Sequence, residues 1–214
     1  IFRLSKFSLS FFRTQIAEGS MLPSGKMPYE VFIPAYRDEI LSDTVMVYGN
    51  VDEVELVLNG KTIRRQTADK GPDSDYIPVP NGGNGKNLHF PPFTFYGVPK
   101  ERGVLKAVGY HQGKKVAEYT VKTPGVPERL DITYFESGKP ATKNDLLIVY
   151  VRMLDKQGVL CPVNGIPVEL SVQGGEIVGP TSYPLEAGVA SFLVRTGEIS
   201  KININATGKG FSTR

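Results

Sequence analysis

Three acidic residues at the start of one strand pattern are the first candidates for acid–base chemistry. Asp52, Glu53 and Glu55 lie within one short stretch, and a glycosidase requires two carboxylates about 5–10 Å apart, flanking the sugar. Because alternate residues of a strand share a face, Glu53 and Glu55 would lie together opposite the basic residues of segment 61–65. We therefore interpret these acids as charge-paired surface residues and predict no catalytic residue in this chain.

The chain has two histidines and one cysteine, which leaves few residues for a metal site or a catalytic nucleophile. His89 and His111 have no second histidine or cysteine at metal-ligand spacing, so a zinc site is not predicted. Asp69, Asp73 and Asp75 lack the spacing of an EF-hand, and we interpret them as turn residues, with a cation site as the weaker alternative. No local signature supports a catalytic triad. The predicted metal and cofactor sets are both none.

Aromatic residues provide the other chemistry that suits a sugar ligand, because flat rings stack on sugar rings. Tryptophan, the best platform, is absent, and Tyr 10 and Phe 11 remain. The Asp- and Gly-rich segment 69–90 contains Tyr76 and His89, and Tyr96 follows it. Loops longer than about 15 residues are often functional. We therefore take Tyr76, His89 and Tyr96 as candidates for contact with carbohydrate or with a neighbouring domain.

Antiparallel strands are the elements that would position these residues. Val54, Leu56 and Leu58 alternate with residues that point the other way, and the run ends in Asn59-Gly60. Asn-Gly supplies the two positive-φ positions of a type I′ turn, so the sequence predicts a hairpin there.

Similar strand patterns continue through the rest of the chain. A second hairpin pattern occupies 104–121, and a further strand is predicted over 29–36. Short strands continue from 129 to 206, with a turn at Asp155-Lys-Gln-Gly, at a spacing typical of a β-sandwich. The proline-rich segment 123–128 reads as a stiff linker. The predicted fold is all-β: two tandem immunoglobulin-like β-sandwiches with a short N-terminal helical segment.

The first fifteen residues hold the best helical pattern of the chain. Leu4, Phe7 and Phe11 recur at three- and four-residue steps, and Phe12 widens the stripe. The alternation of Phe7, Leu9 and Phe11 leaves a strand as the alternative. So many phenylalanines on one short segment indicate that it packs against a partner.

Composition excludes several classes of protein. A chain of 214 residues, 40% apolar and 22% charged, is ordinary for a globular protein of one or two domains. The net charge of +3 is too small for a nucleic-acid interface, and no apolar run is long enough for a membrane span. The single Cys161 excludes an internal disulfide and is expected to be buried. Because the chain begins at Ile1 without signal-peptide features, we expect it to be part of a longer polypeptide.

Several segments resemble one known family in the same order. Val47-Tyr-Gly-Asn-Val-Asp-Glu-Val-Glu-Leu-Val-Leu-Asn-Gly-Lys61 resembles the hairpin that follows the catalytic barrel in bacterial β-galactosidase-like enzymes of glycoside hydrolase family 2. The segment 103–118, followed by Thr123-Pro-Gly, resembles the second hairpin and the exit of that domain. Upstream, 4–15 is similar to the end of the barrel; downstream, 167–179 resembles the bacterial Ig-like domain that ends many such chains.

The resemblance implies a division of the chain into three parts. Residues 1–20 would be a remnant of the preceding catalytic barrel (its last helix), 21–125 a first β-sandwich, and 126–214 a bacterial Ig-like, invasin-type sandwich. The family's two catalytic glutamates belong to the barrel, and no residue of this chain matches their motifs. The chain departs from the family at Val51, where cysteine is common, and in the unusual segment 69–90, which leaves galactosidase specificity open.

The function implied by the resemblance is that of a non-catalytic accessory region that braces the barrel and contacts carbohydrate. Its partner would be the catalytic (β/α)8 barrel of the same polypeptide, docked through Phe7, Phe11 and Phe12, with oligosaccharide as a further candidate. A periplasmic or extracellular location is also implied. Two alternatives stay open: an independent carbohydrate-binding module, which predicts a row of exposed tyrosines on one sheet face, and an adhesin-like surface protein.

Overall fold

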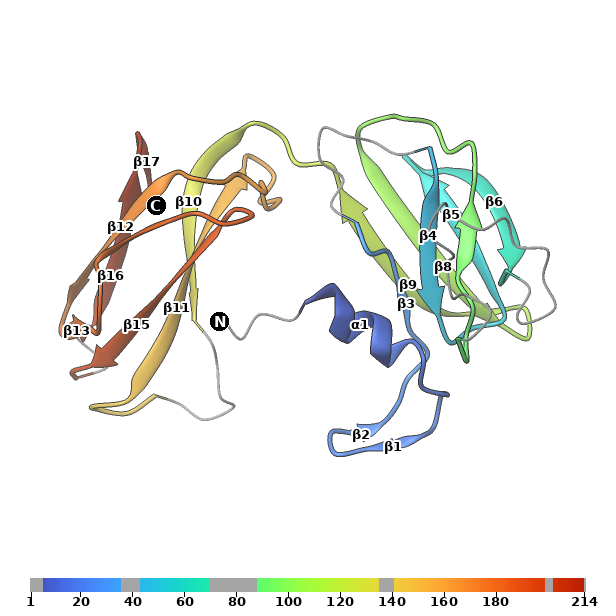
Figure 1. Cartoon of the computed structure of the whole chain (residues 1–214), viewed down its shortest axis with the longest axis horizontal. Coiled ribbons are helices and arrows are strands. Elements are labelled where there is room, and N and C mark those ends of the chain that lie inside the picture. The colour runs from blue at the N-terminus through green and yellow to red at the C-terminus, as the bar shows by residue number, and fades with distance from the viewer. Residues whose placement is uncertain (1–5, 36–42, 70–87, 135–140, 199–201, 214) are drawn as a thin grey trace. The chain divides into compact units, whose positions relative to one another are not determined.

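The structure, a computed structural model of the chain, describes residues 6–35, 43–69, 88–134, 141–198 and 202–213. The chain divides into two compact units, Arg3–Thr123 and Pro124–Arg214 (Figure 1). Antiparallel strands form nearly all the ordered elements, and one short helix, α1, is the only helix among the described residues. This confirms the predicted all-β class with a short N-terminal helix. Within these ranges, a helix with the length and apolar character of a membrane span is absent.

The first unit contains α1 and two antiparallel sheets. Its elements are α1 (Phe7–Arg13), β1 (Met21–Leu22), β2 (Gly25–Lys26), β3 (Val31–Phe32), β4 (Val45–Gly49), β5 (Glu53–Leu58), β6 (Lys61–Thr67), β7 (Phe93–Phe95), β8 (Val104–His111) and β9 (Lys114–Lys122). One sheet has the order β3-β4-β7 and the other β6-β5-β8-β9, while β1 and β2 form a separate hairpin.

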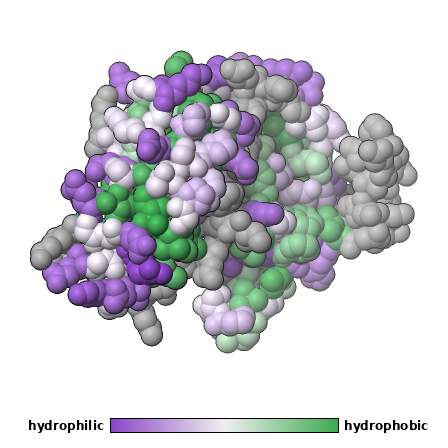
Figure 2. Space-filling model, turned by 60° about the vertical axis from the view of Figure 1, so that its left-hand side comes forward, coloured by the Kyte–Doolittle hydropathy of each residue, from purple (hydrophilic) through white to green (hydrophobic). Residues whose placement is uncertain are grey.

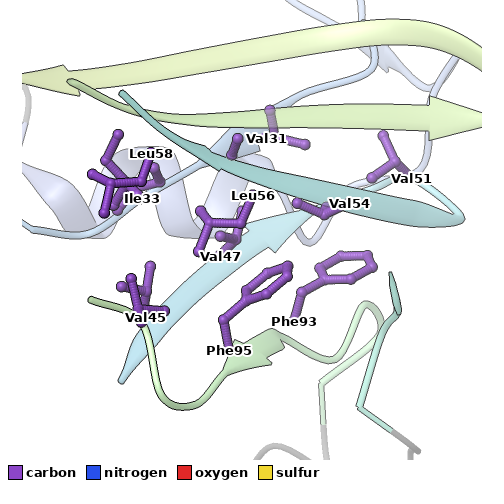
Figure 3. Close-up of a cluster of buried hydrophobic side chains, with 13 residues drawn as sticks. Val31, Ile33, Val45, Val47, Val51, Val54, Leu56, Leu58, Phe93 and Phe95 are labelled. Atoms are coloured by element: carbon purple, nitrogen blue, oxygen red, sulfur yellow. The ribbon is translucent and has the colours of Figure 1, made fainter. Parts of the chain in front are cut away.

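The core of the first unit lies between its two sheets. Val54, Leu56 and Leu58 of β5 are buried, as their alternation predicted. Phe93 and Phe95 of β7 are fully buried and point towards β5 (Figure 3). Burying a side chain of this size contributes about 1.5–3 kcal/mol. The apolar alternation therefore supplies the main force that brings the two sheets together.

The Asn59-Gly60 turn has the predicted backbone and an additional contact. Asn59 has φ 51° and Gly60 has φ 81°, which confirms the two positive-φ positions. The Asn59 side chain also accepts a hydrogen bond from the Val104 N–H (2.9 Å) and donates one to the Arg102 carbonyl (3.1 Å). A Cβ on Gly103 would lie 1.9 Å from Asn59 Oδ1, so this bridge requires glycine there.

The second unit contains two four-stranded antiparallel sheets. Its elements are β10 (Pro127–Tyr134), β11 (Leu146–Asp155), β12 (Pro167–Gln173), β13 (Gly175–Ile177), β14 (Ser182–Pro184), β15 (Val189–Thr196), β16 (Asn203–Gly208) and β17 (Phe211–Ser212). The sheet orders are β10-β11-β15-β13 and β14-β12-β16-β17. Buried Val151 and Val168 come from different sheets and share one core with Cys161, which is buried as expected.

One local prediction needs correction and another is confirmed. The strand expected over 29–36 is only Val31–Phe32, because Pro28 and Pro34 flank it and cannot donate a ladder hydrogen bond; Tyr36 lies outside the described residues. The N-terminal pattern forms a helix, α1 (Phe7–Arg13), rather than the alternative strand, and Leu4 lies outside the described residues.

Candidate functional site

The carboxylates of β5 belong to a hydrogen-bonded group that we call the polar network: Glu53, Glu55, Thr62, Arg65 and Tyr110. Arg65 Nη2 lies 2.5 Å from Glu53 Oε2. Glu55 accepts hydrogen bonds from Thr62 Oγ1 (2.6 Å) and from the Tyr110 hydroxyl (2.7 Å). The Arg65 guanidinium carbon lies 3.7 Å from the centre of the Tyr110 ring, at cation–π distance. Each carboxylate of the network therefore already has a donor.

Strand register explains why these side chains meet. Glu55 lies opposite Arg65 on β6, and Glu53 lies opposite Tyr110 on β8. Residues directly opposite each other share one face of a sheet. A register shift between Leu56 and Val57 then brings Thr62 opposite Val57, next to Glu55.

The electrostatics of the polar network do not suit a catalytic acid. The hydrogen bond from Thr62, followed by that from Tyr110, lowers the pKa of Glu55. The same contact with Glu55, with burial, raises the pKa of Tyr110. A glycosidase general acid needs a raised pKa so that it holds a proton at working pH. The polar network therefore supports the interpretation of Glu53 and Glu55 as charge-paired surface residues.

His111 contacts Asp52 and Tyr29. The exposed tip of the second hairpin is Gln112-Gly113, whereas His111 ends β8 and is only half-exposed. Its Nδ1 lies 3.1 Å from Asp52 Oδ1, and its ring stacks on Tyr29 with centres 5.0 Å apart. Asp52 Oδ2 also accepts the Gln112 N–H (2.8 Å), and this bond, with that to His111, lowers the pKa of Asp52. Asp52 and His111 therefore hold the turn together.

The aspartates considered for a cation site are only partly described. Asp69 accepts hydrogen bonds from the Thr94 N–H (3.2 Å) and Thr94 Oγ1 (2.5 Å), so its carboxylate secures β7. Asp73 and Asp75 lie outside the described residues. In the part of the chain that the structure describes, no group of three or more His, Cys, Asp and Glu is arranged to hold a metal ion.

Of the three residues considered for carbohydrate contact, the structure describes only His89 and Tyr96. Tyr76 lies outside the described residues, His89 is exposed with its ring edge-to-face with Phe90, and Tyr96 is exposed just after β7. Exposed tyrosines among the described residues are Tyr96, Tyr134 and Tyr183. They occur after β7, at the end of β10 and in β14, which belong to three different sheets. The described tyrosines therefore do not form the row that a binding module predicts.

One side of α1 packs against the first unit. The Phe7 ring lies edge-to-face with Phe32, with centres 5.5 Å apart, and the Phe11 ring lies edge-to-face with Tyr48 at 5.0 Å. Phe32 and Tyr48 are directly paired residues of β3 and β4. The helix therefore lies across these two strands, with Phe7 and Phe11 half-buried.

Polar side chains secure the same helix at its C-terminal end. Arg13 Nε lies 3.0 Å from both carboxylate oxygens of Glu30. The Gln15 side chain donates to the Phe90 carbonyl and accepts from the Phe90 N–H, both at 3.1 Å. These contacts join the helix to segments far away in the sequence.

Asn50 makes a third set of contacts that hold the segment after α1 in place, and the sequence did not predict this role. Its buried Nδ2 donates to the carbonyls of Ile16 and Pro28, each at 3.0 Å, and its Oδ1 accepts the Glu30 N–H at 2.6 Å. An asparagine between two strands is typical of a turn, so its type alone did not indicate this role.

The opposite side of α1, with β1, leaves large apolar side chains exposed. Leu9 is 50% exposed, Phe12 64% and Met21 75%; we call these three residues the α1–β1 surface. Leu9 and Phe12 are three residues apart and share one helix face, and the Phe12 ring lies edge-to-face with Phe11 at 5.4 Å. Apolar side chains reach the surface among hydrophilic ones elsewhere too, as the green areas of Figure 2 show. Leu9 and Phe12 differ from these because they lie on α1, which Phe7, Phe11 and Arg13 hold in place.

Comparison with known proteins identifies similar chains. The model of a family described as a domain of unknown function, DUF4982, matches residues 42–117. A β-galactosidase of Thermoanaerobacter pseudethanolicus is 30% identical over 92% of this chain and 26% of its own length. A β-galactosidase of Rhizobium radiobacter is 30% identical over 59% of this chain and 91% of its own length. The chain thus spans about a quarter of the first of these relatives.

A solved structure shares the fold. It is described as a β-glucuronidase from glycoside hydrolase family 2, and it superposes with a TM-score of 0.67 at 22% identity, over 87% of this chain and 20% of the other.

Proposed function

Because this chain belongs to glycoside hydrolase family 2, as the C-terminal domain region of its bacterial β-galactosidase-like members, we propose that it is an accessory region of such an enzyme. It braces the catalytic (β/α)8 barrel of the same polypeptide and is itself non-catalytic. The β-galactosidase of Thermoanaerobacter pseudethanolicus matches this chain over only 26% of its own length. Most of that enzyme therefore lies outside the matched region, which supports an accessory role.

The exposure of Phe12 is the observation that carries the bracing role. α1 is held in place by Phe7, Phe11 and Arg13, yet Phe12 is 64% exposed. Burying a phenylalanine side chain contributes about 1.5–3 kcal/mol, so a rigid, exposed one is available for a docking partner. In this proposal the α1–β1 surface docks on the barrel.

The state of the β5 carboxylates supports the non-catalytic part of the proposal. Glu55 has a lowered pKa and two donors, and Glu53 is paired with Arg65. The reaction would therefore take place in the barrel, with glycosidic bonds as its substrate class. Exposed His89 and Tyr96 are the described candidates for a weak contact with oligosaccharide, and the proposed location is periplasmic or extracellular.

The test of bracing uses the enzyme that contains the barrel, with Phe12→Ser as the variant. We expect the temperature of half-inactivation to fall by several degrees, because an interface of about 1–2 kcal/mol is lost. Leu146→Ser, which alters an exposed leucine of the second unit, is the matched control and should change little. Equal inactivation temperatures for both variants and the wild type would contradict bracing through Phe12.

The non-catalytic role has its own measurement. The 214-residue chain is incubated with chromogenic β-galactosides and β-glucuronides, and no hydrolysis above the blank is expected. Turnover that disappears in Glu55→Gln would overturn this part of the proposal.

A further inference from the structure

Asp155, the last residue of β11, is a buried carboxylate that the proposed function does not use. Its side chain is 1% exposed. Oδ1 accepts the N–H groups of Gln157 (2.9 Å) and Val159 (2.8 Å), which closes the turn that follows β11. Oδ2 accepts the N–H of Gly125 at 2.6 Å. One carboxylate therefore joins the turn to a residue thirty positions earlier in the chain.

Few charged or titratable groups face this carboxylate. Arg129 of β10 donates to the Asp155 carbonyl (2.9 Å), and the buried thiol of Cys161 lies 3.7 Å from the Gly125 carbonyl. Burial acts to raise the pKa of Asp155, but the N–H bonds, the one from Gly125 first, outweigh it and lower the pKa. Burial, with the Asp155 charge, raises the pKa of Cys161. Asp155 is therefore an anion and Cys161 a neutral thiol at neutral pH.

Gly125 is suited to this close approach. A Cβ added there would lie 3.2 Å from Asp155 Oδ2, which is tighter than an ordinary contact. The chain just before Gly125 is also anchored, within the first unit: the Thr123 N–H donates to the Gly103 carbonyl (2.8 Å), and Thr123 Oγ1 accepts the Gly103 N–H (3.1 Å). Only Pro124 separates these two anchored residues.

We propose that Asp155 is a latch that holds the linker at Gly125 and keeps the chain between β9 and β10 closed to proteases. The latch requires both carboxylate oxygens as acceptors. Oδ1 binds the N–H groups of the turn, and Oδ2 binds the N–H of Gly125 in the linker. It is independent of the proposed docking on the barrel, since all its bonds lie within residues 125–159.

Limited trypsin digestion of the 214-residue chain tests the latch. Lys122 and Arg129 flank the linker, and cleavage after each is quantified by mass spectrometry. Asp155→Asn keeps the size of the side chain but replaces one acceptor oxygen with a donor, so cleavage at these two sites should accelerate roughly tenfold. Val168→Ala, a core variant at a residue that makes none of the latch hydrogen bonds, controls for general loss of stability. Equal acceleration in both variants, at matched melting temperature, would overturn the proposal.

Amide hydrogen exchange of the wild-type chain provides a second test that requires no variant to fold. The latch predicts that the N–H of Gly125 is protected to a similar degree as that of Val159, because both donate to the same carboxylate. Exchange of Gly125 at the rate of a free peptide, beside a protected Val159, would show that no latch exists.

Discussion

The first unit has two exposed regions that differ in how their side chains are satisfied. In the polar network on β5, β6 and β8, every carboxylate has a donor, and an arginine lies over a tyrosine ring. On the α1–β1 surface, Leu9 and Phe12 are exposed on a helix whose other side is packed, and Met21 is exposed on β1. The carboxylates of the polar network therefore need no further partner, whereas burial of the exposed apolar side chains by a partner would be favourable.

The difference shows that acidic residues are not the best indicator of a functional surface in this unit. Acidic residues attract attention because they can catalyse, but a carboxylate with two donors and a lowered pKa is a poor general acid. An anchored, exposed phenylalanine has no chemistry of its own, yet it is a better indicator of a partner. Variants of both regions test this comparison.

Phe32→Ala should have the largest effect. Phe32 is buried between Phe7 of α1 and Tyr119 of β9, so its removal takes away the surface on which the helix rests. We expect the free energy of unfolding to fall by about 3–5 kcal/mol, measured by urea denaturation. A loss below about 1 kcal/mol would show that α1 is not supported in this way.

Asn50→Ala should come next. It leaves the carbonyls of Ile16 and Pro28 and the N–H of Glu30 without their side-chain partner. The expected loss in the free energy of unfolding is about 2–3 kcal/mol. The exposed Asn203→Ala is the control and should change it by under about 0.5 kcal/mol; similar losses in both would contradict the role of Asn50.

Glu55→Gln tests the polar network through its pH dependence. Because the pKa of Glu55 is lowered from 4.5, the ionised side chain stabilises the fold above its unfolded-state pKa and loses this effect as pH falls through the folded-state pKa. The wild type should thus exceed Glu55→Gln in stability at neutral pH by under about 1 kcal/mol, since the network is partly exposed. This advantage should vanish in acid.

The Glu55 titration has an internal control. In Thr62→Val the first donor to Glu55 is gone, so the pKa of Glu55, followed by carbon-13 NMR, should rise towards its ordinary value. An unchanged pKa would mean that the network does not bind the carboxylate.

Phe12→Ser should have the smallest effect in the 214-residue chain. Phe12 is mostly exposed, so its loss should change the free energy of unfolding by no more than about 0.5 kcal/mol. The contrast with its expected effect in the enzyme containing the barrel sharpens the comparison. A large loss in the chain alone would place Phe12 among the packed residues instead.

Local patterns were sufficient where the partner lies nearby in sequence. The alternation of Val54, Leu56 and Leu58 and the Asn59-Gly60 turn gave the first hairpin, because side-chain direction and backbone φ depend on adjacent residues. The helix was predicted from Phe7 and Phe11, although its length was not, since helix ends depend on the contacts of Arg13 and Gln15. The three-part domain division and the carbohydrate contacts stay predictions.

By itself, the sequence determined the all-β class, the short N-terminal helix and the position of the Asn59-Gly60 turn. Only the tertiary structure decided which polar side chains connect distant segments by hydrogen bonds. Asn50 bonds to the segment after α1, His111 to the residue before β5 and Asp155 to the linker. The reason is physical. Asn50 bonds to a residue 34 positions away, His111 to one 59 positions away and Asp155 to one 30 positions away. Such contacts depend on how the strands fold together rather than on neighbouring residues in the sequence.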